Sequence, residues 1–127
     1  MRFRFPLLPA EFEIPDSWWA EAGMTAFRAN ERGYQSSAEA ALVLLRTVEP
    51  PLRNPGVLLD WQGFDRERMI RVLSAMATGA EMPPVPVVAL LPAADPAGPF
   101  TWRVCDGFHR FYASVAAGFE MLPVEIR

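Results

Sequence analysis

Thirteen prolines divide the chain into short segments, and they limit the length that any helix or strand can reach. Proline lacks a backbone N–H and has a fixed φ, so it interrupts helices and the hydrogen-bond ladders of central strands. The clusters in "EPPLRNPG" (49–56) and "AADPAGP" (93–99) therefore predict a rigid loop and a turn. At 127 residues, about half of them apolar, the chain is expected to form one domain with a proper core.

The clearest helix is predicted over residues 65–79. Asp65 precedes the pattern as an N-cap, and Gly79 follows it as a stop. Between them runs one apolar stripe at helical spacing, made of Met69, Val72, Leu73 and Met76.

A second helix is expected to follow Asp106 and Gly107 and to end near Ala117, where Gly118 stops it. Its buried stripe is predicted to be Phe108, Phe111, Tyr112 and Val115.

Strands are predicted near residues 85–91, 100–106 and 121–127, and the alternation in "RFRF" (2–5) suits another. A short helix is expected from Asp16 or Ser17, as N-cap, to Gly23, and residues 25–37 are expected to be irregular. Residues 36–48 are ambiguous, because Ser36 and Glu39 have capping-box spacing whereas "LVLL" favours a buried strand. We expect a short helical turn that leads into a strand near 42–45.

The order of these elements is strand, helix, strand, strand, helix, strand after an N-terminal extension. This order predicts an α+β (mixed α/β) domain, with a small mixed sheet and flanking helices. Residues 1–40 are expected to be an extension packed on the domain formed by residues 41–127.

Composition excludes several classes of function. The net charge is −3, so generic attraction to DNA or to anionic membranes is not favoured. All twelve basic residues are arginines, which suit bidentate contacts with oxyanions. A single cysteine cannot form an internal disulfide. The longest apolar run, Ala40–Leu45, is far too short to span a membrane, and the N-terminus is a poor signal peptide. A cytoplasmic protein without membrane association is expected.

The stretch "VCDGFHRFYASVAAGF" (104–119) carries the best candidate for a functional site. N–H groups in the first turn of a helix lack intrahelical acceptors, and the helix dipole adds positive charge there, so this turn suits an anion. Gly107 would let a ligand approach the backbone closely. His109 and Arg110 lie in that turn and are predicted to point away from the core, where both can reach a phosphate. Asp106 could cap the helix, hold His109 in one tautomer, or bind a metal that accompanies a nucleotide.

Less specific interpretations compete with this one. An Asp-Gly pair between a strand and a helix is often only a cap, and a histidine at a helix start is often only a surface residue. Arg53 and Asn54, in the proline-stiffened loop, could be held in place for binding, although a solvated turn explains them as well. Cys105 is expected to be a small core residue, because a reactive thiol needs exposure and a lowered pKa.

The stretch "VCDGFHRFYASVAAGFEMLPVEIR" resembles the signature of the ParB N-terminal domain and sulfiredoxin superfamily, in its Asp-Gly-X-His-Arg form, which includes ParB-like nuclease domains. In that signature a strand runs into a Gly-X-(His/Arg)-Arg turn, then a helix ending in Ala-Gly, then a strand with Pro-Val. The segments "PPVPVVAL", 65–79 and "PPLRNPG" occur in the order that the superfamily has, so the resemblance covers about residues 42–127.

The resemblance implies a compact fold in which the turn 107–110 cradles nucleotide phosphates. Gly107, Phe108, His109 and Arg110 would form that turn, and the loop with Arg53 and Asn54 would approach it from across the sheet. Asp106 matches the Asp of members that include a free-serine kinase, and Glu49 falls near the place of a catalytic carboxylate. Phe108 stands where sulfiredoxins have their reactive Cys, so sulfinic acid reduction is not expected. Arg127 directly follows the closing strand, so no helix-turn-helix for a DNA clamp is expected here.

Two classes of function follow from the resemblance and the residues together. One is an enzyme of phosphoryl transfer or phosphodiester hydrolysis, with Asp106 and His109 catalytic and with ATP, ADP or CTP and Mg²⁺ as ligands. The other is a non-catalytic module that senses a nucleotide or binds a partner protein. A nucleic-acid accessory role is not favoured, and no metal site of the protein's own is predicted. The sequence does not decide whether the protein is an enzyme.

Overall fold

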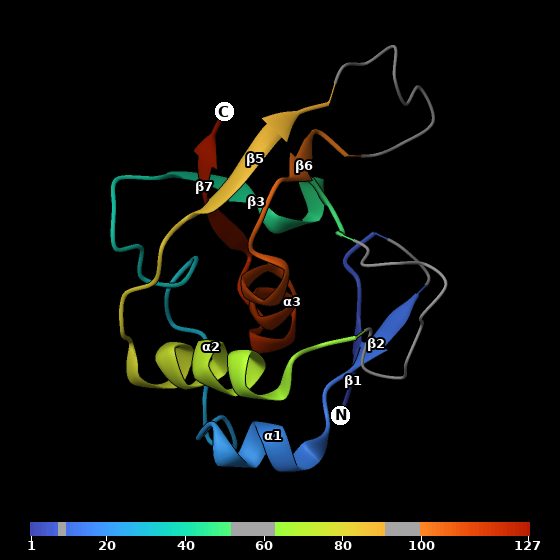
Figure 1. Ribbon diagram of the computed structural model, residues 1–127, viewed down its shortest axis with the longest axis vertical. Coiled ribbons are helices and arrows are strands. Elements are labelled where there is room, and N and C mark those ends of the chain that lie inside the picture. The colour runs from blue at the N-terminus through green and yellow to red at the C-terminus, as the bar shows by residue number, and fades with distance from the viewer. Residues whose placement is uncertain (8–9, 52–62, 91–99) are drawn as a thin grey trace.

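The computed structural model describes residues 1–7, 10–51, 63–90 and 100–127, and Figure 1 traces the order of its helices and strands. In chain order these are β1 (Arg2–Arg4), β2 (Glu11–Glu13), α1 (Asp16–Glu21), β3 (Ala41–Leu44), the 3₁₀ turn η1 (Leu45–Thr47), β4 (Val48–Glu49), α2 (Arg66–Thr78), β5 (Val85–Ala89), β6 (Trp102–Val104), α3 (Phe108–Ala117) and β7 (Met121–Ile126). The predicted α+β class is confirmed.

A five-stranded mixed sheet with the order β3-β7-β5-β6-β4 forms one layer. β7 is parallel to β5 and β4 is parallel to β6, whereas the β3–β7 and β5–β6 pairs are antiparallel. The inner strands β5 and β7 carry buried apolar residues, whereas β6, which is also an inner strand, is half-buried and exposes Arg103. Helix α3 lies between this sheet and α2, and α1 lies beyond α2 (Figure 1).

Helix α2 begins and ends where its sequence predicts. The Asp65 carboxylate accepts a hydrogen bond from the Arg68 amide at 2.9 Å, and Gly79 ends the helix in the left-handed conformation. Met69, Leu73 and Met76 are buried, and Val72 is half-buried. Both the caps and the stripe are therefore confirmed.

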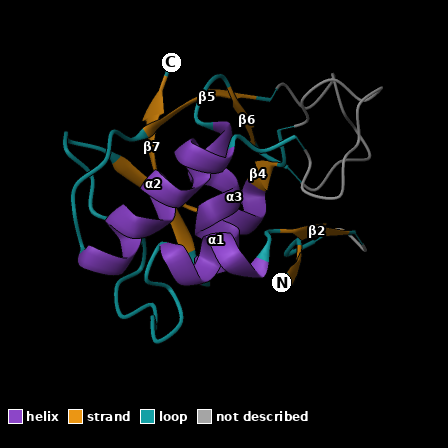
Figure 2. Cartoon of the chain, turned by 60° about the horizontal axis from the view of Figure 1, so that its bottom comes forward, coloured by secondary structure: helices purple, strands orange, loops and turns teal. Residues whose placement is uncertain are grey.

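The N-terminal segment supplies part of the same core. β1 pairs with β2 in an antiparallel ladder, and the strand at β2 was not predicted. The Phe12 ring lies 5.0 Å from Tyr112 of α3 and 6.1 Å from Phe64, between centroids. In Figure 2 this hairpin and the helices are seen from below the view of Figure 1. The hairpin thereby contacts the helix that carries the candidate site.

Two predicted caps of the N-terminal half are wrong. Pro15 is the N-cap of α1 and no described side chain caps that helix, because the Asp16 carboxylate accepts from the N-terminal amine of Met1 at 2.6 Å instead. The helical turn expected from Ser36 is not formed, because the Ser36 hydroxyl donates to the Ala38 carbonyl at 2.6 Å and its backbone bridges to Met82.

Other sequence expectations hold in part. The strand expected near 42–45 is β3 at Ala41–Leu44, and the strand expected at 85–91 ends at Ala89. Residues 52–56 of the predicted rigid loop and the whole turn 93–99 lie outside the described residues. Within the described ranges no helix has the length and apolar character that a membrane crossing requires.

We predict that Phe12→Ala lowers the free energy of unfolding by about 3–5 kcal/mol, because it removes a core aromatic ring and leaves a cavity. Phe12 is 2 % exposed, whereas Leu7 of the same hairpin is 47 % exposed. Leu7→Ala is therefore the matched control, with an expected change within about 0.5 kcal/mol. Urea unfolding of both variants measures the difference. Equal small losses would show that the hairpin is not part of the core.

Candidate functional site

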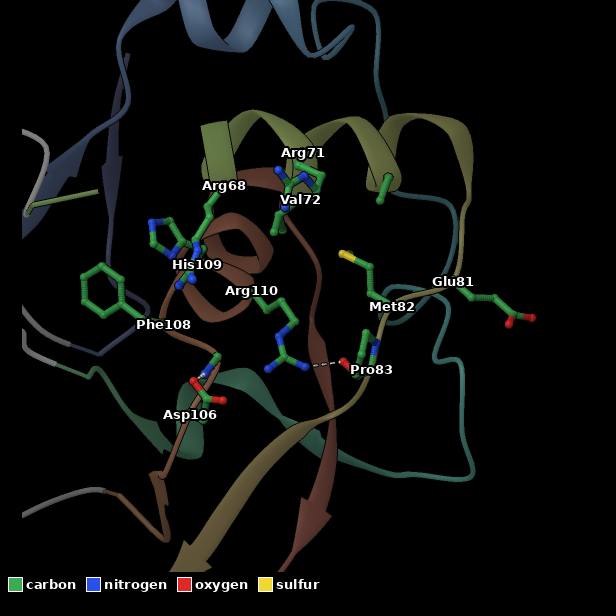
Figure 3. A pocket seen from close by; sticks show the side chains of 12 residues that line it. Arg68, Arg71, Val72, Glu81, Met82, Pro83, Asp106, Phe108, His109 and Arg110 are labelled. Atoms are coloured by element: carbon green, nitrogen blue, oxygen red, sulfur yellow. Dashed lines mark hydrogen bonds between the residues drawn. The ribbon is translucent and has the colours of Figure 1, made fainter. Parts of the chain in front are cut away.

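The first turn of α3 faces a cavity of about 440 Å³. The lining residues come from α2, from the segment before β5 and from the start of α3: Arg68, Arg71, Val72, Ala75, Glu81, Met82, Pro83, Asp106, Gly107, Phe108, His109 and Arg110. Figure 3 shows Arg68 and Arg71 extending from α2, while Arg110 extends from α3 toward Pro83. The four residues predicted to cradle a phosphate, 107–110, thus line one cavity together with Asp106.

Gly107 is the N-cap of α3, with a left-handed φ of 97° that favours glycine. No described side chain caps this helix. The Asp106 carboxylate, a predicted cap, accepts instead from the amide of its neighbour Gly107 at 2.8 Å, before the helix begins. No described carboxylate therefore accepts from the N–H groups of the first turn of α3, and none neutralises the partial positive charge at this end of the helix from within that turn.

Arg110 occupies the space over Gly107. Its Nη1 donates to the carbonyl oxygens of Pro83 at 2.7 Å and Pro84 at 3.0 Å. A Cβ on Gly107 would lie 3.0 Å from Nη2 and 3.2 Å from Nε of this guanidinium. The prediction that Gly107 leaves room for a ligand is thus corrected, because the missing side chain makes room for Arg110.

His109 lies inside the core, contrary to the expectation that it points away from it. The residue is 6 % exposed, and its Nε2 accepts a hydrogen bond from the Asp65 amide at 2.9 Å. The rings of Phe64 and Phe108 lie 5.9 and 5.4 Å from the imidazole. The expectation failed because it assigned only one buried face to α3, whereas α2 covers a second face. His109 consequently joins the first turn of α3 to the start of α2.

Charges around the cavity are unequal. Three guanidinium groups, of Arg68, Arg71 and Arg110, line it together with two carboxylates, of Asp106 and Glu81. In the described part of the chain none of these three arginines forms an ion pair. Arg110 is held by neutral carbonyls, so its charge is not cancelled. The cavity therefore carries positive charge that a bound anion would neutralise.

The charge of the cavity also acts on the cap of α2. The hydrogen bond from the Arg68 amide lowers the pKa of the Asp65 carboxyl, and the charge of Arg68 adds to this effect. Asp65 is exposed, so solvent screens this charge. The stabilisation of α2 by this ionised cap is present above the usual carboxyl pKa and is lost as the pH falls through the lowered value.

Sequence reasoning missed Arg68 and Arg71. They are three residues apart on the polar face of α2, so their side chains are neighbours. Their spacing in the sequence predicts two neighbouring arginines on α2. Only the packing of α2 against α3 shows that they face the cavity.

Other predicted residues do not join the cavity. Glu49 of β4 pairs with Arg103 of β6, with Oε1 and Nε 3.0 Å apart, and neither residue lines the cavity. Cys105 is exposed, so the prediction of a core cysteine is wrong. Arg53 and Asn54 lie outside the described residues. Among the residues that are described, no group of three or more His, Cys, Asp and Glu side chains could hold a metal ion.

No protein-family model, no curated protein and no solved structure matches the chain. The resemblance to the ParB and sulfiredoxin superfamily therefore stays a prediction from the motif.

We predict that Gly107→Ala destabilises the protein more than Gly118→Ala. Both glycines have left-handed φ, 97° and 86°, so both variants carry the same kind of backbone strain, about 1–2 kcal/mol. Only at Gly107 does the new Cβ also contact Arg110, whereas nothing lies within 4 Å of a Cβ at Gly118. Thermal unfolding of the two variants measures the excess at Gly107. Equal losses would show that Arg110 does not depend on the missing side chain.

We also predict that the neutral imidazole of His109 carries its proton on Nδ1, because Nε2 accepts the Asp65 N–H. His109 is the only histidine in the sequence, so its two-bond ¹H–¹⁵N correlations need no assignment. At about pH 8, Nε2 should show the shift of an unprotonated nitrogen. A proton on Nε2 at that pH would contradict the hydrogen bond to Asp65.

Proposed function

We propose that the cavity between α2 and α3 binds the phosphate of a small ligand, with a nucleotide such as ATP, ADP or CTP as the best candidate. One observation carries this proposal: three guanidinium groups without a described carboxylate partner line the same cavity as the uncapped first turn of α3. Arginine is suited to phosphate because its planar fork donates two parallel hydrogen bonds.

Arg110 is the central phosphate ligand in this proposal. Its Nη1 is engaged by Pro83 and Pro84, so the edge made of Nε and Nη2, next to Gly107, is the edge it can present to an anion. Helix N–H groups and a guanidinium edge at the same corner form a site of the kind that binds phosphate. Arg68 and Arg71 would contact further phosphate oxygens from the α2 side.

The rest of the cavity suits the organic part of such a ligand. Val72, Ala75 and Met82 provide an apolar wall beside the arginines. The volume of about 440 Å³ is within the usual range for small-molecule sites. A nucleoside phosphate therefore fits better than a free inorganic ion, which would leave this wall uncovered.

The role of Asp106 distinguishes an enzyme from a non-catalytic binding module. Its exposed carboxylate lines the cavity and would repel a phosphate, unless Mg²⁺ bound with the nucleotide lies between them. Mg²⁺ would neutralise phosphate charge there. Glu49 is paired with Arg103 outside the cavity, and of the two carboxylates that line it, Asp106 and Glu81, Asp106 is the one next to the first turn of α3. Asp106 is therefore our candidate for the base in phosphoryl transfer or phosphodiester hydrolysis.

The second candidate is a nucleotide sensor without catalysis. Nε2 of His109 is already engaged by the Asp65 amide, so a general-acid role would need the other nitrogen or a turned ring. This hydrogen bond favours binding without catalysis.

We also propose that the protein belongs to the ParB-like superfamily and lies in the cytoplasm. Binding to nucleic acid is not favoured, because Arg103 is paired with Glu49 and does not join Arg110 in the cavity.

We predict that a nucleotide at about 100-fold its Kd raises the free energy of unfolding by about 2.7 kcal/mol. Thermal unfolding with titrated ATP, ADP and CTP, with and without Mg²⁺, measures this. Arg110→Gln and Arg68→Gln should each weaken binding about 10- to 100-fold, since each removes a charge-assisted hydrogen bond. Arg46→Gln is the matched control, because Arg46 is exposed and does not line the cavity.

Each contrary result has a distinct meaning. No stabilisation of the wild-type protein by any nucleotide would overturn the proposal. Equal losses in Arg46→Gln and Arg68→Gln would show a general charge effect in place of a site. If a nucleotide binds and is converted, Asp106→Ala should retain binding and lose turnover, and turnover that persists would exclude Asp106 as the base. Binding without any product would identify the sensor.

A further inference from the structure

The carbonyl oxygen of Pro83 accepts hydrogen bonds from two distant parts of the chain. The Tyr34 hydroxyl donates to it at 2.6 Å, and Nη1 of Arg110 donates to it at 2.7 Å. Tyr34 belongs to the N-terminal segment, and Arg110 belongs to the candidate phosphate site. A single acceptor therefore joins the segment 1–40 to that site.

Residues 82–84, here called the strap, are fixed to the N-terminal segment by more than this one bond. The Met82 amide donates to the Gln35 carbonyl at 2.8 Å, and the Ser37 amide donates to the Met82 carbonyl at 2.9 Å. These bonds form an isolated parallel bridge between Ser36 and Met82. The position of the strap thus depends on residues 34–37.

Tyr34 is a constant donor in this arrangement. It is 5 % exposed, and burial raises the pKa of its phenol to about 12, although the charge of Arg110 and a side-chain hydrogen bond with Arg110 act in the opposite direction. The folded-state pKa lies well above neutrality, so the hydroxyl keeps its proton across the physiological range. The Tyr34 hydroxyl therefore contacts Arg110 directly as well as sharing its acceptor, and as a neutral group it does not cancel the charge of Arg110.

The strap in turn fixes the orientation of the Arg110 guanidinium. Both carbonyls that accept from Nη1 belong to the strap, and this anchoring leaves Nε and Nη2 beside Gly107. A side chain held in its binding geometry loses less conformational entropy when a ligand arrives, so its affinity is higher.

We propose that Tyr34 is a positioning residue for the phosphate site: through the Pro83 carbonyl it holds the strap that orients Arg110, so the affinity of the site depends on the docking of residues 34–37. This inference rests on the proposed phosphate-binding function and adds a means of regulation to it. Any change that displaces residues 34–37 should lower the affinity without touching the ligand.

The test compares two tyrosine variants. Tyr34→Phe removes the hydrogen bond to Pro83, and Tyr112→Phe removes an equivalent one, from the Tyr112 hydroxyl to the Pro51 carbonyl at 2.8 Å. Calorimetric titration uses pyrophosphate and Mg·ATP as probes. We expect Tyr34→Phe to weaken binding about 3- to 10-fold, the equivalent of one hydrogen bond, and Tyr112→Phe to change it less than 2-fold. Equal effects of the two variants would overturn the inference.

A double-mutant cycle tests whether the effect passes through Arg110. In the Arg110→Gln background, Tyr34→Phe should have no further effect on pyrophosphate or Mg·ATP binding. An undiminished effect would show that Tyr34 acts by another route and would overturn the inference. If the wild-type protein binds neither probe, the proposed function fails and the positioning role fails with it. If the wild-type protein binds and the two tyrosine variants bind with equal affinity, only the positioning role fails.

Amide hydrogen exchange tests the connection without any ligand. Arg110→Gln should speed exchange of the Met82 and Ser37 amides, because it removes the strap's bonds to α3, whereas Arg46→Gln should leave them unchanged. Identical exchange in the two variants would show that Arg110 and residues 34–37 are not connected through the strap, and this result too would overturn the inference.

Discussion

The burial of Tyr112 is the interaction on which the rest of the structure depends. Its ring is fully buried, and rings from the N-terminal hairpin, from the approach to α2 and from α3 itself surround it: Phe5, Phe12, Phe64, Phe108 and Phe111. Aromatic rings at these separations bury large areas and prefer tilted or edge-on contacts, so the cluster restricts how its elements can be arranged. Because Tyr112 lies one turn after the start of α3, the cluster also fixes the position of the helix end where the cavity opens.

The central position of α3 explains why the site lies between two helices. The sheet covers one side of α3 and α2 covers another (Figure 1), so residues at several positions around its first turns are buried. His109 is one of them, and its bond to the Asp65 amide brings the starts of α2 and α3 together. Arg68 and Arg71 follow Asp65 by one and two turns of α2, which places them opposite Arg110. A helix with one buried face would have left His109 in solvent and the arginines apart.

Local features of the sequence were predictable and tertiary ones were not. Asp65 and Gly79 bound α2 as predicted, and Gly118 ends α3, because caps and left-handed glycines act within a few residues. The stripe of α3 was found, but a periodic pattern gives one buried face and does not report a second, so His109 was assigned to the surface. Ser36 and Glu39 have capping-box spacing, but the backbone of Ser36 bridges to Met82, which is distant in sequence, and no helical turn forms. The residues of the turn 107–110 are adjacent in sequence and were therefore predicted together, whereas Arg68 and Arg71 reach the same cavity only through the packing of α2 against α3.

The hydrogen-bond partners of Arg110 fix its geometry without cancelling its charge. A carboxylate partner cancels the charge of an arginine as well as accepting its hydrogen bonds, whereas a carbonyl partner leaves that charge in place. Arg110 is held by the carbonyls of Pro83 and Pro84, which fix its geometry but leave its charge intact. Arg68 and Arg71 add like charge at the same cavity, and the carboxylates of Asp106 and Glu81 offset only part of it. This concentration of positive charge is the physical basis of our proposal that the cavity binds an anion.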